Sequence, residues 1–93
     1  MKVAITGSRG FIGSHLKTRL ENDGHEVVEW DLRQEPPQCI KDFDPQDCNY
    51  VVHLAAYADV RKSLEEPDLY WKNNVENTTR IQKICTYNNI PLL

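Results

Sequence analysis

The first 31 residues constrain the fold more than any other part of the chain, because an apolar run, a glycine-rich turn and an amphipathic segment follow one another without a gap. The apolar run is Val3–Ile5, and the turn, Thr6–Gly13, reads Thr-Gly-Ser-Arg-Gly-Phe-Ile-Gly. Apolar side chains then recur at helical spacing, at Phe11, Ile12, Leu16 and Leu20. These patterns predict a buried strand over residues 2–6 and a helix over residues 11–22. Strand, glycine turn and helix, in that order, begin a parallel α/β sheet.

The three glycines of the turn suit different tasks in the binding of a pyrophosphate. Gly7 lets the chain turn sharply out of the strand, Gly10 lets the backbone approach the phosphates, and Gly13 lets the helix pack tightly on the sheet. The free N–H groups and the dipole at the start of the helix attract negative phosphates. The spacing G-x-x-G-x-x-G is one residue longer than the usual dinucleotide fingerprint, and three glycines in seven residues also fit an ordinary loop.

A second apolar run supplies the acid that a dinucleotide site needs. Val27–Asp31 predicts a second strand, and Asp31 ends it, 18 residues after Gly13. A carboxylate at this point binds the 2′- and 3′-hydroxyls of an adenosine ribose. The combination predicts dinucleotide binding. The alternatives are a structural turn and a solvated acid at a strand end.

The rest of the chain continues the alternation of strands and helices. Residues 33–47 contain three prolines and several charges, and they predict a loop with one short turn of helix. Residues 50–56 predict a third strand and its exit, 59–66 a short helix, 68–88 the longest helix, and 91–93 the start of a fourth strand. One face of the longest helix is expected to be formed by Leu69, Val75, Thr78, Ile81 and Cys85. The order predicts an α/β fold with a parallel sheet and right-handed crossovers.

Composition narrows the class of protein. The chain has 93 residues, 40% apolar and 27% charged, as expected of one soluble globular domain. Its net charge of -3 gives no support for nucleic acid or a membrane surface as a partner. No apolar stretch is long enough to span a bilayer, and the N-terminus leaves no room for a signal peptide before the turn, so we expect a cytoplasmic protein. Cys39, Cys48 and Cys85 lack C-x-x-C spacing and predict free thiols rather than a metal site.

Three segments together resemble the extended short-chain dehydrogenase/reductase family, the NAD-dependent sugar-nucleotide epimerases and dehydratases. Thr6–Gly13 is similar to the family's TGxxGFIG turn, and His53–Ala56 to the HLAA that follows its third strand. Asn73–Val75 is similar to its NNV segment, although Asn77 stands where glycine is usual. The resemblance covers all 93 residues and implies a Rossmann-type, doubly wound parallel sheet.

The resemblance also implies a set of cofactor-binding residues: Gly7, Gly10, Phe11, Ile12, Gly13, Asp31, Leu32, Leu54, Ala55, Ala56 and Asn73. Phe11 and Ile12 would offer backbone N–H groups to the pyrophosphate, and Asp31, with Leu32 beside it, would hold the adenosine ribose. Leu54–Ala56 would line the nicotinamide-side ribose and diphosphate, and Asn73 would bond near that end.

Each implied role has a structural alternative. The two alanines would also suit a helix that packs nearby, and Asn73 would also suit a helix surface. In the family an acidic–apolar pair contacts adenine, and Asp42-Phe43 is the candidate here. His53 is interpreted as a hydrogen-bonded histidine at a strand end, and Trp30 and Trp71 as partly in the core rather than as stacking platforms.

The family's catalytic pair, Tyr-x-x-x-Lys, is absent from these 93 residues. In relatives the tyrosine supplies the proton transfer that hydride transfer at a sugar carbon requires. The closest approach is Tyr57 with Arg61, and a guanidinium is a poor substitute for the lysine. We therefore expect residues 1–93 to be the N-terminal part of an NAD(P)-binding Rossmann domain and to be inactive alone. We also expect the first strand to lack a neighbour on one side, leaving an apolar edge through which the chain self-associates.

Three functions fit these patterns. The first is the NAD-binding half of a sugar-nucleotide 4-epimerase, which Val60–Ser63 favours slightly. The second is a 4,6-dehydratase of the same family, and the third is a non-catalytic nucleotide-binding sensor or interaction module. NAD is expected over NADP, because Asp31 would repel a 2′-phosphate. Arg9 favours NADP instead, since its guanidinium could reach the 2′-phosphate, but it could also pair with Asp31.

Overall fold

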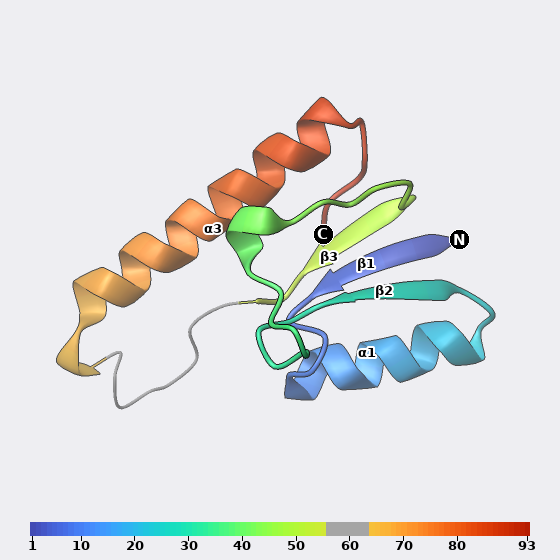
Figure 1. Cartoon of the computed structure of the whole chain (residues 1–93), viewed down its shortest axis with the longest axis horizontal. Coiled ribbons are helices and arrows are strands. Elements are labelled where there is room, and N and C mark those ends of the chain that lie inside the picture. Colours follow the sequence, from blue (N-terminus) through green and yellow to red (C-terminus); the bar gives the residue numbers. More distant parts are fainter. Residues whose placement is uncertain (56–63) are drawn as a thin grey trace.

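The computed structural model describes residues 1–55 and 64–93, which form a three-stranded parallel sheet with helices on both faces (Figure 1). The strands are β1 (Lys2–Thr6), β2 (Glu26–Trp30) and β3 (Tyr50–His53), in the order β2-β1-β3. Along β1, Val3 pairs with Val27 on one side and with Tyr50 on the other. All three strands run the same way, so their carboxyl ends meet at one edge of the sheet. The predicted α/β, Rossmann-type doubly wound parallel sheet is confirmed, in an incomplete form.

The prediction that the first strand has an open edge is wrong. β1 is the central strand, because the third strand of this chain pairs with it directly rather than with β2. The far side of β3 is occupied as well: Leu92 forms a parallel bridge with Val51, and the Val51 N–H donates to the Pro91 carbonyl over 3.0 Å. The expected start of a fourth strand is therefore confirmed. Among the described residues, the outer edge of β2, rather than an edge of β1, has no neighbouring strand.

Helix α1 (Phe11–Asn22) covers one face of the sheet. Val3, Ile5 and Val52 form a buried cluster on this face, and the half-buried side chains of Leu16 and Leu20 pack against it. The helix ends where expected, since Gly24 follows it with φ +87°, a conformation that suits glycine. The alternation of strand side chains explains why the apolar residues of β1 serve both faces.

The other face is covered by α3 (Pro67–Tyr87) and by η1 (Ile40–Asp42), a single turn of 3₁₀ helix in the loop between β2 and β3. This turn confirms the predicted loop with one short helical turn. The cluster on this face contains Ala4, Phe43, Cys48, Val51, Ile81 and Cys85. Trp30 packs against it as predicted: its ring meets that of Phe43 edge to face, and its Nε1 donates to the Cys39 carbonyl over 2.8 Å. The same prediction is wrong for Trp71, which lies in the part of α3 that does not contact the sheet and is 75% exposed. The three cysteines form no disulfide with one another, and Cys48 and Cys85 are buried.

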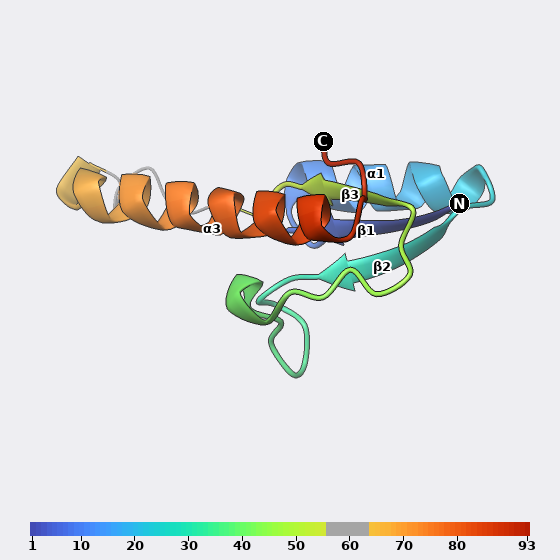
Figure 2. The same ribbon diagram turned by 90° about the horizontal axis from the view of Figure 1, so that it is seen from above.

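Only the second half of α3 contacts the sheet. Of the residues expected on one face of this helix, Ile81 and Cys85 are buried, whereas Leu69 and Val75 are 46% and 43% exposed and Thr78 is exposed as well. Figures 1 and 2 show the reason: the helix runs past the carboxyl edge of the sheet, where none of the described elements lies beside it. Within residues 1–55 and 64–93, no helix is long and apolar enough to cross a membrane.

Candidate functional site

The glycine turn lies at the carboxyl edge of the sheet, between the ends of β2 and β3. The Gly7 N–H donates to the Trp30 carbonyl over 2.8 Å, which ties the turn to β2. Gly7 has φ +74°, and a Cβ at this position would lie 2.8 Å from the Ala55 nitrogen. No other residue fits between the turn and the exit of β3, so Gly7 has a packing role beside its conformational one.

The start of α1 exposes hydrogen-bond donors at this edge. Gly10 precedes the helix in an extended conformation, and no side chain caps the helix. The backbone N–H groups of Phe11, Ile12 and Gly13 have no acceptor within the part of the chain that the structure describes. Such groups and the helix dipole make this point favourable for an anion.

Gly13 differs in role from its prediction. A Cβ at this position would collide with the Gly7 carbonyl oxygen and lie 2.9 Å from the Cα of Ser8. The missing side chain therefore lets the helix pack on the turn itself, rather than on the strands. At Gly10 a Cβ would meet only Gly7 O at 3.3 Å and the Arg33 Nη2 at 3.5 Å, so this side of the turn is more open.

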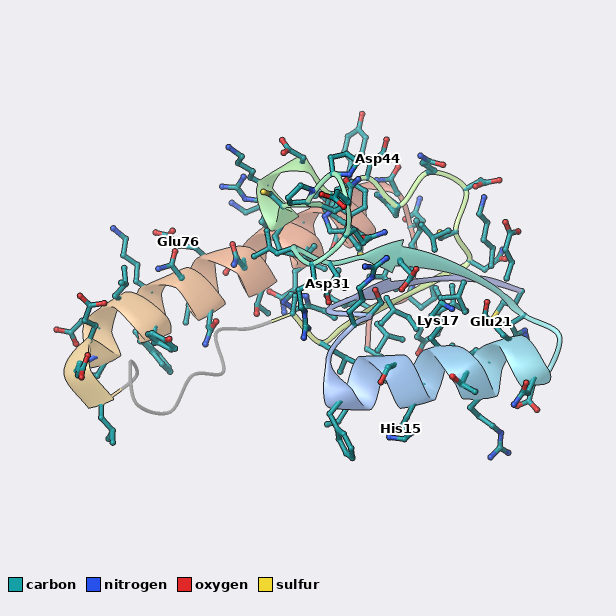
Figure 3. All side chains as sticks on the ribbon, turned by 60° about the horizontal axis from the view of Figure 1, so that its bottom comes forward. His15, Lys17, Glu21, Asp31, Asp44 and Glu76 are labelled. Atoms are coloured by element: carbon teal, nitrogen blue, oxygen red, sulfur yellow. The ribbon has the colours of Figure 1, made fainter. Side chains whose placement is uncertain are left out.

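The carboxylate of Asp31 is buried at the end of β2, next to the turn (Figure 3). Its Oδ2 accepts the Arg9 N–H over 2.8 Å, and its Oδ1 accepts the Arg33 N–H over 2.8 Å. The guanidinium of Arg33 adds two further bonds, from Nε to Oδ1 at 3.1 Å and from Nη2 to Oδ2 at 3.2 Å. Burial alone would raise the pKa of this carboxyl, but the hydrogen bonds and charge of Arg33 and the Arg9 N–H outweigh it and lower the pKa.

Arg33 is the residue at this site that sequence reasoning missed. Arg9 was the candidate partner of Asp31, but only its backbone N–H contacts the carboxylate. The Arg9 guanidinium donates instead to the Arg33 carbonyl over 3.0 Å and lies 3.9 Å from the Glu29 carboxylate. The spacing in the sequence was a usable signal: an arginine two residues after a strand-end aspartate, as Arg33 is after Asp31, is close enough to form an ion pair with it.

A hydrogen-bond network around the Thr6 hydroxyl fixes the exit of β3. The buried Thr6 Oγ1 accepts the Leu54 and Ala55 N–H groups over 3.1 and 3.2 Å and lies 2.6 Å from the His53 Nδ1. Since the hydroxyl already accepts two bonds, its own proton goes to Nδ1, which must then be unprotonated. His53 is therefore neutral with its proton on Nε2, and burial lowers its pKa. The interpretation of His53 as a hydrogen-bonded strand-end residue is confirmed.

The remaining predicted residues fall into three groups. Leu32 and Leu54 are exposed at the same edge, next to Asp31 and Thr6 respectively, and Ala55 is half-buried there. Asn73 lies in α3, and its Nδ2 donates to the Leu69 carbonyl of the same helix over 2.9 Å, as a helix-surface amide does. Ala56, most of the expected helix at 59–66 and the segment Val60–Ser63 lie outside the described residues.

The candidate adenine contact at Asp42-Phe43 is not supported for the ring. Phe43 is only 5% exposed and packs against Trp30 in the core, so its ring has no free face for a base. Asp42 is exposed at the end of η1. Nor does the site contain metal ligands: among residues 1–55 and 64–93, no three histidine, cysteine or acidic side chains are grouped to hold an ion.

Comparison with known proteins places this geometry in context. Residues 3–93 match the profile of the NAD dependent epimerase/dehydratase family. The UDP-glucose 4-epimerase of Haemophilus influenzae is 30% identical over 84% of this chain and 31% of its own length. The solved structure of MoeE5 in complex with UDP-glucuronic acid and NAD matches with a TM-score of 0.84 at 32% identity, over 97% of this chain and 34% of that one.

A second solved structure has a different reaction in its name. TunA, a NAD dependent NDP-hexosamine 5,6-dehydratase, matches with a TM-score of 0.77 at 28% identity, over 99% of this chain and 36% of its own. The chain thus spans about a third of the length of these relatives.

Proposed function

The chain belongs to the NAD dependent epimerase/dehydratase family, and we propose that it forms the NAD-binding portion of a sugar-nucleotide 4-epimerase. One observation carries the proposal: the N–H groups at the start of α1, which have no acceptor among the described residues, and the buried carboxylate of Asp31 meet at one edge of the sheet. The N–H groups suit a pyrophosphate, and the carboxylate suits the hydroxyls of a ribose. The open side of the turn at Gly10, where a Cβ would have few neighbours, fits a close approach of the phosphates.

The proposed roles follow the sheet edge from β2 to β3. Asp31 and Leu32 hold the adenosine ribose, and the N–H groups of Phe11 and Ile12 bind the pyrophosphate within the turn Gly7–Gly13. Leu54, Ala55 and Ala56 line the nicotinamide half. Asn73 is proposed to bond near that end, which requires its amide to leave Leu69.

When bound, NAD supplies reversible hydride transfer at the sugar C4. The residues of this chain bind and orient the cofactor, and the Thr6 network holds the exit of β3 against the turn. No Tyr-x-x-x-Lys pair stands in the 93 residues, so we propose that they are the N-terminal part of a Rossmann domain and catalyse no turnover alone. A nucleotide-sugar substrate, a cytoplasmic location and self-association of the chain are parts of the same proposal, and the outer edge of β2 is the edge available for pairing.

A 4,6-dehydratase is the second candidate. The likeness to TunA supports a sugar-nucleotide dehydratase, although TunA is named for a 5,6-dehydration. Both candidates use NAD at the same site, so they differ only in residues that act on the sugar. A non-catalytic nucleotide sensor is the candidate of another class. A Tyr-x-x-x-Lys pair in the reading frame after Leu93 would support the enzymes, and its absence would support the sensor.

A titration of the chain with NAD, followed by amide NMR, tests the proposal. The largest shifts are expected at Phe11 and Ile12, because their N–H groups gain a phosphate acceptor. Lys83, on the far half of α3, provides an internal reference whose amide should not move. The same sample, given UDP-glucose or UDP-galactose, should form neither the epimer nor NADH. Absence of shifts at the turn would contradict NAD binding, and turnover would contradict the assignment as a binding portion.

A further inference from the structure

We infer that the guanidinium of Arg33 occupies Asp31 in the free chain, and that an adenosine ribose binds by displacing it. This inference rests on the proposed function, because it concerns the same ribose site. Arg33 would thus lower the affinity of the chain for the cofactor, in addition to the contributions of the turn Gly7–Gly13 and of Asp31.

The acceptor positions of the Asp31 carboxylate are already in use in the free chain. An ionised carboxylate has about four lone-pair positions for hydrogen bonds. Four N–H donors already use them: the backbone groups of Arg9 and Arg33, and the Nε and Nη2 of the Arg33 guanidinium. The side chain of Asp31 is only 4% exposed, so little of it is left for a further donor. Two ribose hydroxyls can bond to this carboxylate only if other donors leave.

Of the donors to Asp31, the two backbone N–H groups are fixed in place, whereas the Arg33 guanidinium can leave. The backbone N–H groups of Arg9 and Arg33 are fixed by the turn and by the loop after β2. The Arg33 carbonyl is held by the Arg9 Nη1 over 3.0 Å, which keeps this loop in place. The Arg33 side chain, in contrast, is 62% exposed and makes no other recorded bond within the described residues. Its guanidinium can therefore move into solvent while the backbone around Asp31 stays where it is.

The Arg33 guanidinium also lies in the space that a bound ribose would need. Arg33 Nη2 lies 3.5 Å from the point where a Cβ of Gly10 would stand, so the guanidinium extends from the carboxylate over the open side of the turn. Figure 3 labels Asp31 at this edge of the sheet. A ribose bound to Asp31, with its pyrophosphate on the turn, would need this same space. Arg33 and the adenosine ribose thus compete for the same acceptors and for the same volume.

The test uses ADP and 2′,3′-dideoxy-ADP, which differ only in the two ribose hydroxyls. Arg33→Lys keeps the positive charge near the phosphates but cannot form the two parallel bonds of a guanidinium. We expect this variant to bind ADP about two- to tenfold more tightly than the unaltered chain, a range set by the modest strength of a half-exposed ion pair. Binding of dideoxy-ADP should not change. Arg33→Gln should show the same difference between the two ligands.

Arg19→Gln is the matched control, because it removes one arginine from an exposed ion pair with Asp23 at the far end of α1. It should leave both affinities unchanged. Thermal unfolding of each variant confirms that the fold is kept. Equal or weaker binding of ADP by Arg33→Lys, with ADP bound by the unaltered chain, would overturn this inference and leave the proposed function standing. Failure of the folded, unaltered chain to bind either ADP or NAD would overturn both.

Discussion

Replacement of Thr6 by valine should destabilise the chain through its hydroxyl alone, because valine keeps the shape of threonine. The hydroxyl is fully buried and serves three partners at the exit of β3. Leu54 N–H keeps an acceptor after the change, since it also bonds to the Thr6 carbonyl over 3.0 Å. The Ala55 N–H and the His53 Nδ1 do not.

The magnitude follows from this count. Leaving a buried donor without a partner costs about 1–3 kcal/mol, and loss of an ordinary hydrogen bond costs about 1 kcal/mol. Ala55 is half-buried, which places its cost in the lower part of that range. We expect Thr6→Val to lower the free energy of unfolding by about 2–3 kcal/mol, a large part of the roughly 5–15 kcal/mol typical of a domain.

Urea denaturation measures the effect, and Thr6→Ser is the matched variant. Serine keeps the hydroxyl and loses one buried methyl group, at a cost of about 1 kcal/mol. In the Thr6→Val chain, the NMR signals of the His53 ring nitrogens should also lose the pattern of a single Nε2–H tautomer. A Thr6→Val chain as stable as the Thr6→Ser chain would refute the role given to the hydroxyl.

Two further predictions concern the turn and the pH dependence of stability. Gly13→Ala should strongly destabilise or unfold the chain, because the added Cβ would collide with the Gly7 carbonyl oxygen. Gly10→Ala should fold, because its Cβ would have room. Thermal melts of the two variants test this, and equal melting temperatures would contradict it. Burial lowers the pKa of His53 in the folded chain below its ordinary value of 6.5. As the pH falls below about 7, His53 is therefore protonated in the unfolded chain before it is protonated in the folded one. The free energy of unfolding should decrease over this range until the pH reaches the pKa of His53 in the folded chain. His53→Asn should remove this part of the slope of unfolding free energy against pH, and an unchanged slope would refute it.

The features that sequence could predict are those set by local chemistry. The turn Thr6–Gly13 and the strand-end acid Asp31 were found because glycine spacing and apolar runs are visible along the chain. The second and third strands were predicted as well, but their places on the two sides of β1 were not, because strand order depends on contacts between distant residues. The long helix was placed within one residue at each end, but its period could not show that the sheet supports only the half that carries Ile81 and Cys85.

The same distinction applies within the site. Arg33 was missed because ion pairing in a loop is decided by the backbone path after β2, and no periodic pattern marks it. The pair Asp42-Phe43 was the candidate adenine contact because of the family resemblance, yet the ring of Phe43 packs in the core beside Trp30. Thr6 was counted as part of a strand, and only the register between β1 and β3 reveals its hydroxyl as the centre of a network.

The most direct test of the account is a calorimetric titration of NAD and NADP into the chain and into Asp31→Ala. The account predicts that the unaltered chain binds NAD more tightly than NADP, because the buried carboxylate accepts the ribose hydroxyls and repels a 2′-phosphate. Hydrogen bonds to a charged group contribute about 1.5–3 kcal/mol each, so the substitution should weaken NAD binding by about tenfold or more. It should also narrow or reverse the preference over NADP, since Arg33 is then free to meet the extra phosphate. Unchanged NAD affinity in Asp31→Ala, or tighter binding of NADP by the unaltered chain, would contradict the account.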